Sequence, residues 1–104
     1  MTAKVIIASS ADADFAAILT DLATKAGWRT AAKYDELFDK LYDRLADHLH
    51  SGAPRPALGQ NIRIGIVSPY IVIYRNEGDD GVTVLRIVHG RRRITGGMLR
   101  ETFS

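Results

Sequence analysis

The stretch YIVIYRNEGDDGVTVLRIVHG, residues Tyr70–Gly90, decides the fold of this 104-residue chain. It holds two runs rich in β-branched and aromatic residues, Tyr70–Asn76 and Val82–Gly90, and the acidic segment Glu77–Gly81 that joins them ends in Asp-Gly. Strand-forming runs on both sides of an Asp-Gly turn predict a β-hairpin. A third run, Asn61–Val67, precedes the hairpin across a Ser-Pro turn, so we expect a three-stranded antiparallel meander.

The sequence before the meander predicts one short strand and two helices. Lys4–Ser9 is β-branched and predicts the strand. Ser9 and Asp12 have the spacing of a capping box, which starts a helix, and Gly27 is placed to end that helix. Apolar residues then recur at intervals of three and four, which is typical of helices that bury one face. The first helix carries Phe15, Ile18, Leu19, Leu22, Ala23 and Ala26, and the second carries Tyr34, Leu37, Phe38, Leu41, Leu45 and Leu49.

This order of elements, β-α-α-β-β-β, predicts an α+β fold. Only a few residues connect the two helices, so we expect a helical hairpin packed on one face of a small, mainly antiparallel sheet, with the other face left available. The length is that of one domain, residues 1–104. Gly96 and Gly97 interrupt the end of the chain, and we expect residues 96–104 to form a mobile C-terminal segment.

Composition and charge narrow the class of protein. The chain has no cysteine, which excludes disulfides and thiolate metal sites, and no apolar run long enough to span a bilayer. Its start lacks the pattern of a secretory signal, so we expect a cytoplasmic protein. Residues 1–50 hold six Lys or Arg and eight Asp or Glu, whereas residues 51–104 hold eight Arg and four acidic residues. The second half is therefore basic, and its cations are all arginines, which suit carboxylates and phosphates.

The sequence offers little support for a metal, cofactor or catalytic site. His48, His50 and His89 do not converge with other ligand-type residues, so we expect no metal. Glycine-rich phosphate-binding motifs are missing, so we expect no cofactor. The acidic pair Asp79 and Asp80 lies in the predicted hairpin turn, where carboxylates are solvated and are not set up for acid–base catalysis.

Arginine gathers at the end of the last predicted strand. Arg91, Arg92 and Arg93 follow a His-Gly corner, and no acidic residue occurs between Gly81 and Arg100. Three interpretations compete: a solvated rim, a site that handles phosphate, or a docking surface for a macromolecule.

The alternation of side chains along the last strand predicts which of them face the helices. We expect Thr83, Leu85, Ile87 and His89 to face the helices and Val82, Val84, Arg86 and Val88 to lie on the open face. The neighbouring strands carry Arg63, Tyr74 and Arg75. If the meander pairs as expected, one basic surface is bordered by Arg63, Arg75, Arg86, Arg91, Arg92 and Arg93.

The whole pattern resembles the ParE/RelE superfamily of toxins from bacterial type II toxin–antitoxin systems. The stretches that carry the resemblance are ADADFAAIL (11–19), PRPALG (54–59) and YIVIYRNEGDDGVTVLRIVHGRRRI (70–94), in the order β-α-α-β-β-β. Within the last stretch, Y-x-V-x-Y-R, a short acidic turn and V-L-R-x-x-H-G-R-R resemble the ParE branch.

The resemblance to the ParE branch implies a toxin that inhibits DNA gyrase by binding, and a cognate antitoxin with a disordered segment that folds along the toxin and blocks it. No catalytic residue is then expected, and direct binding of nucleic acid stays open. We expect the target-binding surface to comprise Arg86, His89, Arg91, Arg92 and Arg93. We expect the sheet surface that faces the antitoxin or the target to comprise Arg63, Tyr74 and Arg75.

RelE-like members of the superfamily are instead ribonucleases that cut messenger RNA on the ribosome, with lysines, arginines and a C-terminal tyrosine. This chain departs from that pattern, because no lysine follows Lys40, Ile71 follows Tyr70 where an arginine is often found, and no tyrosine follows Arg93. Two alternatives stay open: a divergent ribonuclease that uses His89 as its base, and a non-toxic protein that only pairs with an antitoxin.

Overall fold

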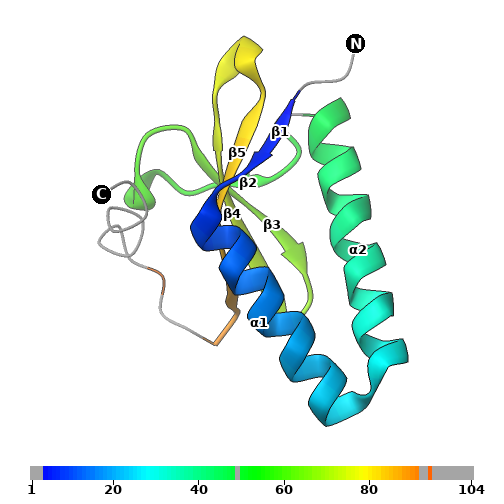
Figure 1. Ribbon diagram of the computed structural model, residues 1–104. Coiled ribbons are helices and arrows are strands. Elements are labelled where there is room, and N and C mark those ends of the chain that lie inside the picture. Colours follow the sequence, from blue (N-terminus) through cyan, green and yellow to red (C-terminus); the bar gives the residue numbers. More distant parts are fainter. Residues whose placement is uncertain (1–3, 49, 92–93, 95–104) are drawn as a thin grey trace.

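The computed structural model describes residues 4–48, 50–91 and 94, and in this part the chain forms two helices on a five-stranded sheet (Figure 1). The elements are β1 (Val5–Ile7), α1 (Ser9–Ala26), α2 (Trp28–Asp47), β2 (Ala53–Pro54), β3 (Ile62–Val67), β4 (Tyr70–Asn76) and β5 (Val82–His89), with 3-10 turns at Pro56–Leu58 and Gly78–Asp80. The strand order is β1-β5-β4-β3-β2, with β1 parallel to β5 and the other neighbours antiparallel. The predicted fold class is confirmed, and β2 is an unpredicted addition. Residues 96–104, which we expect to be mobile, lie outside the described residues.

The two helices form the predicted hairpin and cover one face of the sheet. Gly27 alone joins them, at a φ of 93° that glycine adopts without a Cβ clash. α1 packs against β5 and α2 against β3 (Figure 1). No helix in the described ranges is both long and apolar enough to cross a membrane.

The predicted capping box at the start of α1 is wrong. Ala8 is the N-cap, no side chain caps the helix, and Ser9 already lies inside it. The reason is that the Ala8 amide donates to the Val84 carbonyl, while the Ala8 carbonyl accepts the amide of Asp12. One residue thus carries both the last bond of the strand and the first bond of the helix.

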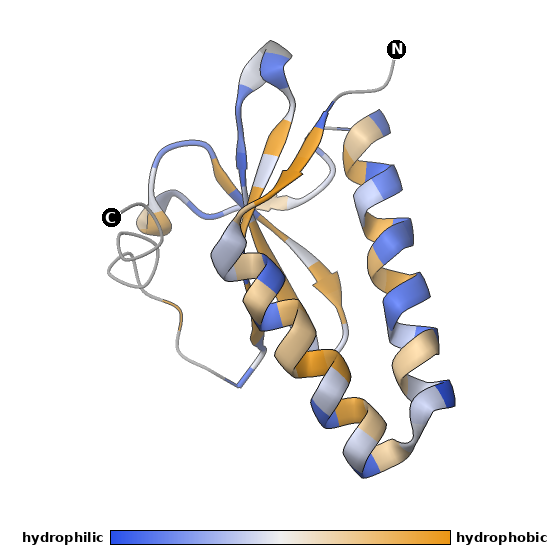
Figure 2. Ribbon diagram, in the orientation of Figure 1, coloured by the Kyte–Doolittle hydropathy of each residue, from blue (hydrophilic) through white to orange (hydrophobic). Residues whose placement is uncertain are grey.

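The main core lies between the helices and the sheet. Figure 2 shows that hydrophobic residues concentrate on the central strands, whereas α2 carries many hydrophilic residues along its length. The buried residues of this core are Ala11, Phe38, Leu41, Leu45, Val67, Tyr70, Val72, Tyr74, Val82, Val84 and Ile87. Phe15 of α1 meets Phe38 edge to face, with ring centroids 5.3 Å apart, and this contact holds the two helices together above the sheet.

A β-bulge in β5 changes the face of the sheet on which some of its side chains lie, so part of the prediction for this strand is wrong. Ile73 pairs with Arg86 and Tyr74 pairs with Val84, so Leu85 is an extra residue in β5. An extra residue reverses the alternation on its N-terminal side relative to its C-terminal side. Val82 and Val84 therefore pack against the helices and Leu85 packs on the opposite face, contrary to the prediction, whereas Ile87 faces the helices as predicted.

The face of the sheet away from the helices is not left open as predicted. A second cluster of buried residues occupies it, formed by Ile62, Ile64, Ile73, Leu85 and Val88. Leu58, from the loop that contains the first 3-10 turn, and Ile94, which follows β5, pack against this cluster. This face therefore contributes to stability and offers less free surface than we expected.

Replacing Tyr42 with phenylalanine is expected to raise the free energy of unfolding by about 1 kcal/mol, because the Tyr42 hydroxyl is buried with no hydrogen-bond partner in the described chain. Burial, assisted by the charge of Asp39, also raises the pKa of Tyr42 from 10.0 to about 12. Above pH 10 the unfolded chain can release this proton and the folded chain holds it, so stability falls as the pH rises toward 12.

Urea denaturation at pH 7 and pH 11 checks this prediction. The advantage of the phenylalanine variant should be larger at pH 11, because it lacks the ionising group. A variant that is less stable than the unaltered protein at pH 7 would show that the hydroxyl is hydrogen-bonded.

Candidate functional site

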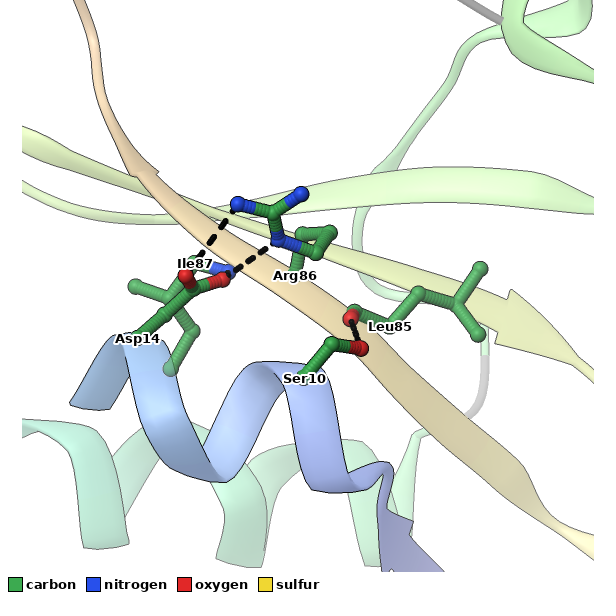
Figure 3. A network of polar contacts seen from close by, with 5 residues as sticks. All are labelled: Ser10, Asp14, Leu85, Arg86 and Ile87. Atoms are coloured by element: carbon green, nitrogen blue, oxygen red, sulfur yellow. Dashed lines mark hydrogen bonds and ion pairs between the residues drawn. The ribbon is translucent and has the colours of Figure 1, made fainter. Parts of the chain in front are cut away.

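The candidate site is the C-terminal half of β5, where this strand leaves its parallel neighbour. β1 pairs with Val82–Val84, and among the described residues no strand lies beside the edge of β5 beyond Val84. Side chains of α1 take over (Figure 3): the Ser10 hydroxyl donates to the Leu85 carbonyl at 3.0 Å, and the Ile87 amide donates to the Asp14 carboxylate at 3.0 Å. The first turns of α1 thus satisfy an edge that would otherwise be open.

Arg86 is part of the same network. It pairs with Ile73, which packs on the face away from the helices, so Arg86 starts on that face as predicted, but its guanidinium reaches past the edge of β5 to α1. Its Nε donates to Asp14 Oδ2 at 2.7 Å and its Nη2 donates to Asp14 Oδ1 at 3.2 Å (Figure 3). The two side chains are only 14% and 19% exposed. Because β1 ends before this part of β5, the long Arg86 side chain can pass the edge of the strand and reach the carboxylate on α1 (Figure 3). Arg86 therefore positions β5 against the helix.

Asp14 is the residue that the sequence interpretation missed. It lies three residues after the buried Ala11 and four before the half-buried Ile18, which places it beside the apolar stripe of α1. An acidic residue at such a position needs a partner, and this is the signal that could have identified it.

The end of β5 presents an exposed His89 and an exposed Arg91. The His89 ring meets the ring of Tyr70 edge to face at 5.8 Å, and its Nδ1 accepts the Arg91 amide at 3.1 Å. Burial, with Tyr34 as a smaller cause, raises the pKa of Tyr70, so its hydroxyl stays neutral at physiological pH. Arg92 and Arg93 lie outside the described residues. The described end of β5 is therefore a surface formed by His89, which packs against Tyr70, and by Arg91, the first residue of the arginine run.

A groove of about 490 Å³ separates this end of β5 from α1. It is lined by Asp14, Ala17, Ile18, Asp21, Tyr70, Ile87, Val88 and His89. Its walls combine apolar surface with two carboxylates on the helix side, which fits a binding groove better than a catalytic cleft. Among the described residues, no three His, Cys, Asp or Glu side chains come together as ligands for a metal ion.

The predicted sheet-surface residues lie at the opposite end of the sheet. Arg75 and Tyr70 are five residues apart on β4, which separates them by about 17 Å. Arg75 Nε donates to Glu77 Oε1 at 2.8 Å, and Arg63 donates to the carbonyls of His50 and Gly52 at 3.1 and 2.6 Å. Among the described arginines, Arg63 and Arg75 are therefore distant from Arg91, and they do not form the expected single basic surface with it.

Tyr74 is not a surface residue. Its side chain is fully buried in the core beneath the helices, and its hydroxyl accepts the amide of Gly52 at 2.9 Å. The prediction is wrong because Tyr74 lies two residues after Val72 on β4, so alternation along this strand places both on the face that packs against the helices. The role of Tyr74 is to hold the loop after α2 against β4.

Comparison with known proteins places this geometry among toxins. Residues 5–94 match the family described as the ParE toxin of the type II toxin–antitoxin system, parDE. A solved structure of the chromosomal ParDE TA system from P. aeruginosa is similar in fold, with a TM-score of 0.70 and 22% sequence identity over 85% of this chain and 96% of that chain. No curated protein matches the chain.

Proposed function

Because the chain belongs to the ParE toxin family of type II toxin–antitoxin systems, we propose that it is the toxin of such a pair, that it inhibits DNA gyrase, and that a cognate antitoxin neutralises it. The family match over residues 5–94 is the observation that carries this proposal. Gyrase is a cytoplasmic enzyme, so we place the action of the chain in the cytoplasm.

The surface that we propose to contact the target is the end of β5, with His89 and Arg91 and the sequence neighbours Arg92 and Arg93. Arg91 is exposed, and the sequence has no acidic residue between Gly81 and Arg100, which favours docking to an anionic surface, such as gyrase-bound DNA or an acidic protein patch. Arg86 contributes indirectly, because its bonds to Asp14 fix the strand that carries this surface. Inhibition by binding needs a shaped, charged surface and no catalytic group.

Purified chain added to DNA gyrase is expected to reduce supercoiling and to accumulate cleaved DNA, because a poison stabilises the enzyme on broken DNA. Supercoiling of a relaxed plasmid, followed by denaturation to reveal broken DNA, measures both effects. A ribosome-dependent messenger RNA cleavage reaction serves as the parallel control and should leave the RNA intact. Cut RNA with normal supercoiling would contradict the proposal and favour a RelE-like ribonuclease. Normal supercoiling with intact RNA would contradict it as well.

A further inference from the structure

The outer edge of β3 is only partly covered. β2 pairs with β3 at Ile64 and Arg63 and extends no further. The Asn61 carbonyl accepts a bond from β4, whereas the Ile62 carbonyl accepts one from the β2 side. The backbone groups of successive residues in a strand point to opposite sides, so every second residue after Ile62 has its groups directed away from β4. The amide and carbonyl of Ile66 therefore point away from β4. In the described part of the chain no strand lies beside Ile66 to pair with them.

A groove runs between this free edge and α2. It consists of two adjoining cavities of about 490 and 400 Å³, which share Leu41, Arg44 and Ile66 in their linings. Leu41 packs so closely over Gly65 that a Cβ at Gly65 would lie 3.0 Å from Leu41 Cδ1. The Ile66 side chain is 54% exposed. The groove therefore has an apolar floor and, along one side, a backbone edge that can accept a strand.

The rim of the groove is basic. Lys40 and Arg44 project from α2, and Arg55 lies on the loop after β2; all three are exposed. Lys40 lies 3.5 Å from Glu36, but both side chains are 69% exposed, and such a pair is weak. Neither Arg44 nor Arg55 forms an ion pair with another described residue. An occupant with carboxylates beside its backbone would complement these charges.

The free edge lies at the same end of the sheet as the proposed target surface. Val67 of β3 pairs with Tyr70 of β4, which in turn pairs with His89 of β5. Two strand spacings separate β3 from β5, a distance of about 10 Å. A segment bound at Ile66 could therefore continue across the end of the sheet to His89 and Arg91.

We propose that an extended acidic segment of the antitoxin adds to the sheet as a strand beside Gly65–Val67, with its apolar side chains in the groove and its carboxylates against Arg44 and Arg55. This inference rests on the proposed toxin–antitoxin function and adds the place and the mode of binding. The main-chain bonds to Ile66 supply affinity, and the alternating side chains supply specificity. Bound there, the segment blocks the neighbouring target surface.

The test uses the product of the reading frame adjacent to this gene as the probe, with affinity measured by calorimetry. Ile66→Pro removes the outward amide, and a proline is tolerated at a sheet edge where that amide has no strand partner. We expect this variant to bind at least about tenfold more weakly, the loss that corresponds to one or two backbone bonds. Ile66→Thr is the matched control, because it keeps both the amide and the β-branched shape, and it should bind within about threefold of the unaltered chain.

Charge reversal tests the rim. Arg44→Glu should weaken binding by at least about threefold in low salt, whereas Arg29→Glu, at the far end of α2, should leave it unchanged. Both variants should still arrest growth when they are expressed alone. Equal affinity of Ile66→Pro and Ile66→Thr, or of the two charge variants, would overturn the proposed mode of binding.

Amide exchange of the unaltered chain gives an independent measurement if Ile66→Pro fails to fold. The Ile66 amide should exchange at least about tenfold more slowly in the complex, because a new strand protects it. Unchanged exchange at Ile66 in a tight complex would overturn the inference and leave the toxin–antitoxin function standing. No complex and no growth arrest with the unaltered chain would instead overturn the proposed function, and this inference with it.

Discussion

Replacing Asp14 with alanine is expected to lower the free energy of unfolding by about 3 kcal/mol, because the Arg86 guanidinium and the Ile87 amide lose the carboxylate that accepts their three bonds. The Asp14 carboxylate accepts two bonds from the Arg86 guanidinium and one from the Ile87 amide. Both charged side chains are mostly buried, so water cannot replace the lost partner fully. The C-terminal half of β5 should also loosen, because this network and the Ser10 bond hold its edge.

Urea denaturation measures this change in the free energy of unfolding, when both proteins are fitted with the same dependence of that free energy on urea concentration. Asp12→Ala is the matched control, because Asp12 is an exposed acid of the same helix, and it should cost less than about 0.5 kcal/mol. Asp14→Asn should fall between the two, since its amide oxygen can still accept the Ile87 amide. A cost below about 1 kcal/mol for Asp14→Ala would show that the network contributes little to stability.

Local sequence patterns predict the strands and helices of this fold well. Tyr70–Asn76 is predicted to the residue, because β-branched alternation and flanking turns are encoded within the strand itself. The helical hairpin is predicted because a periodic apolar face stops at Gly27 and resumes at once. β2 is not predicted, since two residues carry no periodicity and their pairing depends on the loop that returns along β3.

The site is harder to predict because it depends on one local irregularity and one distant contact. Nothing in VTVLRIVH marks Leu85 as an extra residue, and the bulge reverses the faces of Val82 and Val84. The bond between Arg86 and Asp14 joins residues 72 positions apart, so neither local pattern shows it. The arginine run is visible in the sequence, but the separation of Arg91 from Arg63 and Arg75 follows only from strand register.

Replacing Arg91, Arg92 and Arg93 together with alanine is expected to abolish growth arrest and to raise the concentration needed for gyrase inhibition by at least about tenfold, which corresponds to about 1.4 kcal/mol of binding. Arginines are frequent among the residues that dominate interfaces, and three adjacent cations without an acidic neighbour in the sequence should contribute jointly. Arg91 is exposed, and it bonds to His89 through its backbone amide, so we expect the fold to tolerate the loss of its side chain.

Measuring the stability of each variant shows whether a loss of toxicity comes from the missing arginine side chains or from unfolding. The triple variant should unfold at the same urea concentration as the unaltered chain, whereas Asp14→Ala should unfold earlier. Arg29→Ala, which removes an exposed arginine from the first turn of α2, is the charge control and should remain toxic. Full toxicity of a well-expressed triple variant would place the target surface elsewhere, and the groove between α1 and β5 would then be the next region to alter.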